Sequence, residues 1–174
     1  MDIYTNIIAS QVRRYSMSNQ DGLSEFGDLW ALMYITFARE MVDSFGNEGK
    51  EALIRAVRTY GRTRGLRLKE NHLKQGLPIT LRSLFENYDL PAHPATEKTR
   101  TEFTDDKLVS YTYVCPYERV WRSKNASDLG RIYCENFHHA MWQAYRADID
   151  VQIPEILTTD DPHCKFLVSQ PKHK

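Results

Sequence analysis

The chain has 174 residues, of which 41% are hydrophobic and 26% are charged, a composition typical of a globular protein with one domain and a sizeable core. Lys and Arg together number 23, as do Asp and Glu, so the formal net charge is zero. This balance argues against nucleic acid or an anionic membrane surface as a partner. The longest apolar stretch, LWALMYITFA at residues 29–38, is about half as long as a bilayer-spanning helix requires.

The first residues of the chain and its cysteine count both bear on its location. The opening segment, MDIYTNII, lacks the basic segment and the long apolar region of a signal peptide, so we expect a cytoplasmic protein. Three cysteines in a reducing compartment favour thiols or metal ligands over a disulfide framework, and the odd count favours the same interpretation.

Helical periodicity runs through the first half of the chain, about residues 1–90. Apolar residues recur at helical spacing over residues 1–15. A second helix is predicted from Asp28, a suitable N-cap, to Gly46, a residue favoured just after a helix end. It is apolar nearly all round, which indicates a place in the core. A third helix is predicted over 47–76, with an apolar stripe on one face and basic residues on the other.

Two glycines and a cluster of arginines mark this third helix. Gly61 and Gly65 are four residues apart, so they leave one side of the helix without side chains and allow close approach by another helix or by a ligand. The arginines could bind a carboxylate, although a solvated helix face is the favoured explanation. A further short helix, TLRSLFENY, is predicted after Pro78. The arginines are Arg55, Arg58, Arg62, Arg64 and Arg67.

The second half of the chain, about residues 96–170, alternates strands with one helix. TRTEFT and KLVSYTYVCPYERVW read as two strands joined by a turn at Asp105 and Asp106. Pro116 is expected to end the ladder or to mark an edge. A helix is predicted over 127–146 with Ser127 as its N-cap, and two further antiparallel strands follow. Strand alternation places four side chains of the second strand on one face: Val109, Tyr111, Tyr113 and Cys115.

This order of elements predicts an α+β fold, in which N-terminal helices pack on an antiparallel sheet of β-β-α-β-β order. Because no linker interrupts the chain, residues 1–174 are expected to form a single domain.

The helix over 127–146 carries the most suggestive pair of side chains. Cys134 and His138 are four residues apart, so their side chains are neighbours on one face of the helix. A neighbouring imidazolium can lower the pKa of a thiol and so produce a nucleophilic thiolate. A cysteine on a helix is, however, most often a small buried hydrophobe. Cys164 shares its strand face with apolar residues, which favours burial, while His163 points the other way.

Metal binding and acid–base chemistry are further possibilities. Three thiols together with His138 or His163 could bind zinc, although no two cysteines have the short spacing of structural zinc motifs. Three carboxylates could act as acid or base groups, with a structural role as the alternative for each: Glu135, Asp160 and Asp161.

Four segments, in chain order, resemble characteristic blocks of the L-2-amino-thiazoline-4-carboxylic acid hydrolase family. They are GNEGKEALIRAVRTYGRTRG, VCPYERVW, LGRIYCENFHHA and DDPHCKFLV, and the resemblance runs from about residue 27 to residue 169. Each of the three cysteines lies in one of these blocks. Two positions depart from the family pattern: His138 stands where an acidic residue is common, and Arg146-Ala147 stands where Asn-Pro is common. These departures bear on the substrate more than on the fold.

The resemblance implies a hydrolase that opens a small heterocycle, a thiazoline, cyclic amidine or cyclic amide, which carries a carboxylate. Cys134 would be the nucleophile or a ligand to a metal that activates water, and His138 would be its base or co-ligand. His163 and Cys164 would complete the site, and if zinc were bound Cys115 would be a further ligand. The resemblance also implies substrate-binding residues: Arg62, Arg64, Tyr111, Tyr113 and Cys115.

Two other functions are consistent with the same residues. The pocket could bind a small molecule without turnover, as a sensor does, or zinc could stabilise an interaction domain. No nucleic-acid motif and no membrane partner is predicted. An apolar first half with exposed aromatic residues such as Trp30 or Trp121 could also support a homo-oligomer.

Overall fold

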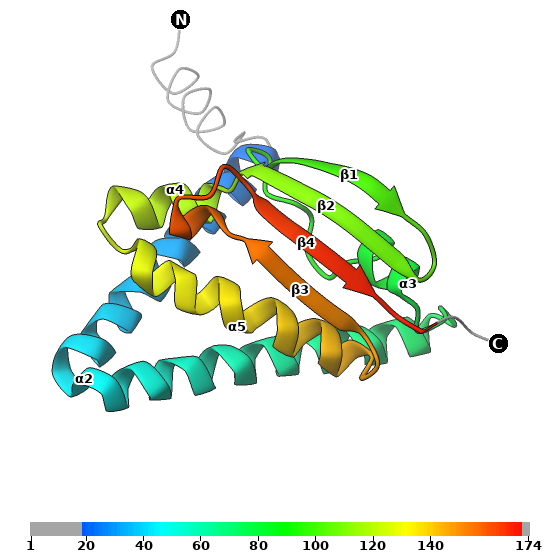
Figure 1. Cartoon of the computed structure of the whole chain (residues 1–174), viewed down its shortest axis with the longest axis horizontal. Coiled ribbons are helices and arrows are strands. Elements are labelled where there is room, and N and C mark those ends of the chain that lie inside the picture. The colour runs from blue at the N-terminus through cyan, green and yellow to red at the C-terminus, as the bar shows by residue number, and fades with distance from the viewer. Residues whose placement is uncertain (1–18, 172–174) are drawn as a thin grey trace, which may run out of the picture.

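The computed structural model describes residues 19–171 and joins helices to a four-stranded antiparallel sheet, which confirms the predicted α+β class (Figure 1). The predicted helix over 1–15 lies outside the described residues. The helices are α2 (Asn19–Lys74), α3 (Leu81–Glu86), α4 (Pro116–Ser123) and α5 (Ser127–Tyr145), with a short 3₁₀ turn at Leu157–Thr159. The strands are β1 (Glu97–Phe103), β2 (Lys107–Val114), β3 (Asp150–Glu155) and β4 (Cys164–Ser169).

Helix α2 consists of two arms that meet at a sharp bend (Figure 1). The bend is at Gly46, whose φ of 55° and ψ of −130° are accessible to glycine and costly for other residues. The predicted helix end at Gly46 therefore marks the bend, and a second arm continues directly to Lys74. The first arm begins earlier than the predicted N-cap at Asp28.

The second arm of α2 packs closely against α5. A Cβ atom added at Gly61 would lie 2.8 Å from the carbonyl oxygen of Phe137, and one added at Gly65 would lie 2.1 Å from that of Met141. Both distances are too short for a side chain, so the two glycines are required for this contact. Of the two partners considered from sequence, another helix or a ligand, the structure places a helix against these glycines.

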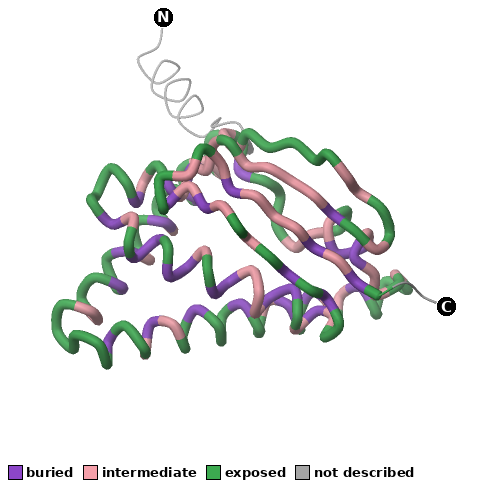
Figure 2. Tube along the Cα trace, viewed as in Figure 1, coloured by how far each residue is buried: buried purple, intermediate pink, exposed green. Residues whose placement is uncertain are grey.

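The sheet has the strand order β1-β2-β4-β3, and its two faces have different environments. Leu108 pairs with Val168, which in turn pairs with Val151, and these three side chains are buried toward the helices. Tyr111 pairs with Lys165 and points to the opposite face. Figure 2 shows that buried residues gather where α5, α2 and the sheet meet.

Four details of the sequence interpretation are wrong. The second strand ends at Val114, and Pro116 begins helix α4, because proline fits the first helical position where no N–H bond is lost. The resulting order is β-β-α-α-β-β. Ser127 is the first residue of α5, and Ala126 is its N-cap.

Trp121, expected to be exposed, is buried, and its indole N–H donates to the carbonyl of Ala31 at 3.1 Å. Trp30 is partly buried in the same aromatic cluster rather than exposed.

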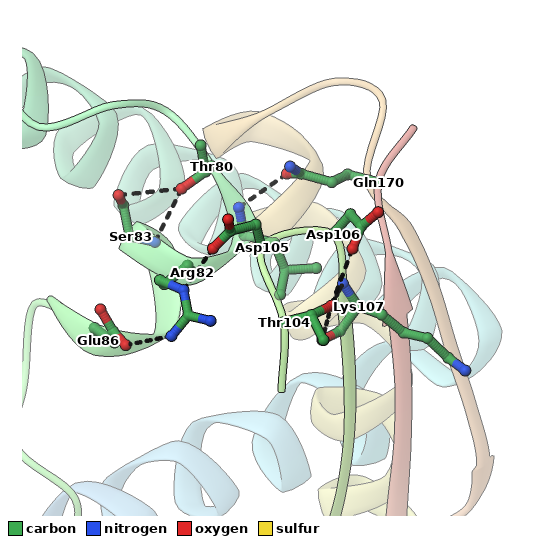
Figure 3. A network of polar contacts seen from close by, with 10 residues as sticks. Thr80, Arg82, Ser83, Glu86, Thr104, Asp105, Asp106, Lys107 and Gln170 are labelled. Carbon is green, nitrogen blue, oxygen red and sulfur yellow. Dashed lines mark hydrogen bonds and ion pairs between the residues drawn. The ribbon is translucent and has the colours of Figure 1, made fainter. Parts of the chain in front are cut away.

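A polar network fixes α3 against the end of the sheet (Figure 3). Thr80 caps α3 by accepting from the backbone N–H of Ser83, and Gln170 accepts from the backbone N–H of Leu81 at 2.8 Å. Arg82 binds Asp105 in the β1–β2 turn. These contacts hold α3 against the β1–β2 turn and the end of β4.

Among residues 19–171, no helix combines the length and the apolar character needed to cross a membrane.

Candidate functional site

Helix α5 directs His138 toward the inner face of the sheet, where aromatic rings enclose it. The imidazole centroid lies 5.2 Å from the ring of Phe137, 4.9 Å from that of Trp142 and 5.1 Å from that of Phe166. Phe137 and Trp142 belong to the same helix, whereas Phe166 comes from β4. The meeting of α5 and the sheet therefore builds an apolar wall around one polar ring.

One ring nitrogen of His138 is free for a ligand. Its Nδ1 is buried and has no hydrogen-bond partner within the described part of the chain. Burial lowers the pKa of His138 to about 3, and the positive charges of His139 and Arg64 act in the same direction. The imidazole is therefore neutral at physiological pH, and in one tautomer Nδ1 can accept a hydrogen bond.

The three cysteines, Cys115, Cys134 and Cys164, lie near one another beside His138, and these four residues form the cluster of the candidate site. Burial raises the pKa of Cys134 well above its usual value, and the nearby thiols of Cys115 and Cys164 raise it further. Burial also raises the pKa of Cys164 to about 11, although the backbone N–H of Leu157 donates to its sulfur at 3.3 Å. Three cysteines from distant positions in the sequence thus lie near one another.

Cys115 occupies the N-cap position of α4, where a helix dipole favours a thiolate. Burial nevertheless raises its pKa, and the backbone N–H groups of Glu118 and Tyr117 offset only part of that increase. All three thiols are therefore protonated at neutral pH. A resting thiolate–imidazolium pair at Cys134 and His138, the arrangement proposed from sequence, is disfavoured because both groups are neutral.

The thiols and histidines do not fit the metal site considered from sequence. Across residues 19–171, no three His, Cys, Asp or Glu side chains are arranged so that they could share a metal ion.

The structure separates His163, Tyr111 and Tyr113 from this cluster. Cys164 pairs with Thr112 on the inner face of the sheet, so the side chains one residue along each strand point outward. The imidazole of His163 lies 5.0 Å from the ring of Tyr111 and 5.7 Å from that of Tyr113, and its Nε2 is 2.9 Å from a carboxylate oxygen of Glu155. These three residues form an outer aromatic group, apart from Cys134 and His138.

Of the five arginines, Arg64 is the one placed near the cluster. Its Nε and Nη2 donate to the two carboxylate oxygens of Asp89 at 2.9 and 2.5 Å. Its guanidinium lies 5.3 Å from the ring of Phe137 and 5.8 Å from those of Tyr60 and Tyr88. Burial alone would lower the pKa of Arg64, but the hydrogen bonds to Asp89 and the neighbouring charges raise it. Arg64 is a permanently charged, partly enclosed cation.

A groove of about 560 Å³ begins at Arg64 and runs between the second arm of α2 and the segment before β1. Tyr88 lines the groove and also reaches the cluster, because its hydroxyl accepts from the indole N–H of Trp142 at 3.4 Å. Trp142 in turn packs on His138. Arg62 is exposed on the opposite side of the helix and does not line the groove.

The remaining candidates have structural partners. Arg58 donates to Asn136 and Arg55 pairs with Glu51, whereas Arg67 lines the groove. Three carboxylates serve local roles: Glu135 pairs with Arg131, Asp160 pairs with Arg122, and Asp161 accepts from Ile156 and Thr159.

Sequence reasoning missed the aromatic residues and the acid around this site. Trp142 follows His138 by four residues, so helical spacing could have found it. Phe166, Tyr88 and Asp89 come from other elements, and no local pattern connects them to His138.

Comparisons with known proteins give a family and a fold. The model of a family described as L-2-amino-thiazoline-4-carboxylic acid hydrolase matches residues 29–168. None of the curated proteins matches the chain. A crystal structure of a trafficking protein particle complex subunit 3 from Naegleria fowleri, covalently bound to palmitic acid, has a similar fold. The TM-score is 0.50 at 12% identity, over 84% of this chain and 96% of that one.

Proposed function

Because the chain belongs to the L-2-amino-thiazoline-4-carboxylic acid hydrolase family, we propose that it opens a small cyclic amidine by hydrolysis at the cluster around His138. The observation that carries this proposal is the free Nδ1 of His138, a buried polar atom without a partner in residues 19–171. Unpaired buried polar atoms are costly, so native structures keep few of them, and a binding role accounts for this one. The neighbouring thiols of Cys134 and Cys164 would line the same site.

We propose that water is the nucleophile, because attack by Cys134 would require a thiolate and burial raises the pKa of this thiol well above its usual value. We propose instead that His138 Nδ1 accepts a proton as the oxygen of water bonds to the amidine carbon. The ring nitrogen of the thiazoline would gain one proton of the water. The ring carbon–sulfur bond would then break as the new carbon–oxygen bond becomes a carbonyl, and the other proton of the water would pass to the departing sulfur to give a carbamoyl-cysteine product.

Arg64 would hold the carboxylate of the substrate. Phe137 contacts both Arg64 and His138, so the carboxylate and the ring of a small heterocycle would bind on either side of its aromatic ring. Two nitrogens of Arg64 bind Asp89, and no hydrogen bond within the described residues uses Nη1, which could donate to a second carboxylate. A carboxylate near His138 would also raise the pKa of the imidazole and so make it a stronger base.

The choice of nucleophile can be tested with the purified full chain and 2-amino-thiazoline-4-carboxylic acid. We expect ring opening by the wild type, a rate within about 10-fold of wild type for Cys134→Ala, and no covalent adduct on intact protein after rapid quenching. An adduct that disappears in Cys134→Ala, together with loss of turnover, would establish the thiol as the nucleophile. Binding without turnover in the wild type would instead indicate a non-catalytic binding module.

A second experiment tests the role of Arg64. Arg64→Gln should raise KM by about 10-fold or more, because a charge-assisted hydrogen bond contributes about 1.5–3 kcal/mol. Asp89→Asn serves as the matched control, since it removes the ion pair but keeps the guanidinium. If Arg64 binds substrate, KM should fall or stay unchanged in Asp89→Asn. An equal rise of KM in both variants would show that the pair only positions the segment before β1.

A further inference from the structure

The first arm of α2 carries a row of apolar side chains that nothing else in residues 19–171 covers. The helix carries no charged residue between Asp28 and Arg39. The opposite face of the same helix is buried in the core through Ala31, Ile35 and Ala38. The exposed members and their exposed fractions are Phe26 (64%), Leu29 (58%), Leu32 (38%), Met33 (50%) and Phe37 (63%).

The row is large enough to form the centre of a stable interface. If each free side chain exposes roughly 150–200 Å², these five residues present on the order of 500 Å² per chain. Apolar patches of that size are at the upper end of those on monomers and commonly mark interaction sites. Two such rows would bury about 1,000 Å² of apolar surface, and polar residues at the rim would bring the contact to the usual 1,200–2,000 Å².

The pattern of the row is close to palindromic. Phe26 and Phe37 stand near its two ends, and Leu29 and Met33 stand between them. An antiparallel pairing about a two-fold axis would place the Leu29 of one copy near the Met33 of the other. This self-complementarity is what a two-fold interface between identical chains requires.

Charges around the row argue against a membrane as its partner. Asp21, Glu25 and Asp28 precede or flank the row at one end, and Arg39, Glu40 and Asp43 follow it at the other, so acidic residues outnumber basic ones around it. Anionic lipid surfaces repel such a rim, since they bind helices with basic polar faces. A groove of about 520 Å³ beside Leu29 and Leu32, bounded by Val120 and Lys124 of the α4 region, offers space for side chains of a second copy.

We infer that the protein forms a homodimer in which the first arms of α2 pair antiparallel through this row. The interface is separate from the proposed hydrolytic site, so neither proposal depends on the other.

Light scattering and sedimentation of the full chain test this inference. The wild type should be a dimer, and Met33→Glu and Phe37→Glu should each raise the dimer dissociation constant by more than about 100-fold, because each would bury an unpaired carboxylate. Leu73→Glu is the matched control, because Leu73 is 58% exposed on the second arm of α2 and should leave the dimer intact. Circular dichroism confirms that each variant is folded.

Two results would overturn the homodimer. One is a wild type that stays monomeric at all concentrations, as expected if another segment of the chain covers the row. The other is a dimer that survives both Met33→Glu and Phe37→Glu, because it would use a different surface.

Discussion

His138 is held neutral by its surroundings, and this has a consequence for stability. In the unfolded chain the imidazole binds a proton below its ordinary pKa of about 6.5, whereas in the folded chain burial lowers that pKa to about 3. The unfolded state therefore binds more protons between these two values. Acidification through this window favours unfolding, and the stability that the neutral ring provides is fully present only above about pH 6.5.

We expect the free energy of unfolding of the wild type to fall as pH decreases from 6.5 toward 3, with His138 contributing at most about 1.4 kcal/mol per pH unit. In His138→Gln this contribution should vanish, so the difference between the two curves isolates it. Denaturant unfolding at several pH values measures both. Parallel curves for the two proteins would show that His138 titrates normally and is not sequestered.

At the residue scale, sequence predicted the neighbours that local spacing fixes. The i,i+4 relation placed Cys134 beside His138 on one face of a helix. Spacing could not predict the pKa shifts on that face, because they depend on burial by residues of other elements, such as Phe166 of β4, and on Arg64 of α2. Cys134, expected from sequence to be a thiolate, is therefore a protonated thiol in the folded chain.

At the scale of elements, the contact between α2 and α5 depends on two glycines. Gly65→Ala should lower the free energy of unfolding by about 1–3 kcal/mol, because the added methyl meets the carbonyl oxygen of Met141 and the two helices must separate. Gly22→Ala is the control: nothing lies within 4 Å of its added Cβ, so it should be neutral or stabilise by up to about 1 kcal/mol. Equal stability of both variants would contradict the close contact.

Sequence predicted most elements because breaking and turn residues mark their ends, whereas both predicted N-caps, Asp28 and Ser127, were misplaced. The bend at Gly46 and the turn at Asp105-Asp106 were both found this way. Pro116 was misassigned because a proline after a strand can end a ladder or begin a helix. Trp121 contacts Ala31, which is far away in the chain, and Gly130 at the start of α5, and these contacts favour the helix.

At the scale of the whole molecule, the four-stranded sheet separates two groups that sequence had joined. His163, Tyr111 and Tyr113 lie on its outer face, and Cys134 and His138 lie under its inner face. One residue of strand register decides the face of every side chain, and the register between β2 and β4 depends on the full topology. The similarity to the Naegleria fowleri subunit is a similarity of fold, and it agrees with that topology.

The role of His138 in hydrolysis can be tested by comparing turnover of 2-amino-thiazoline-4-carboxylic acid by the wild type, His138→Gln and His139→Gln. His139, the adjacent residue on α5, is the matched control. We predict that His138→Gln lowers kcat by about 10²–10⁴-fold, the usual contribution of a general base, while His139→Gln stays near wild type. Turnover by His138→Gln at the wild-type rate would contradict the assignment.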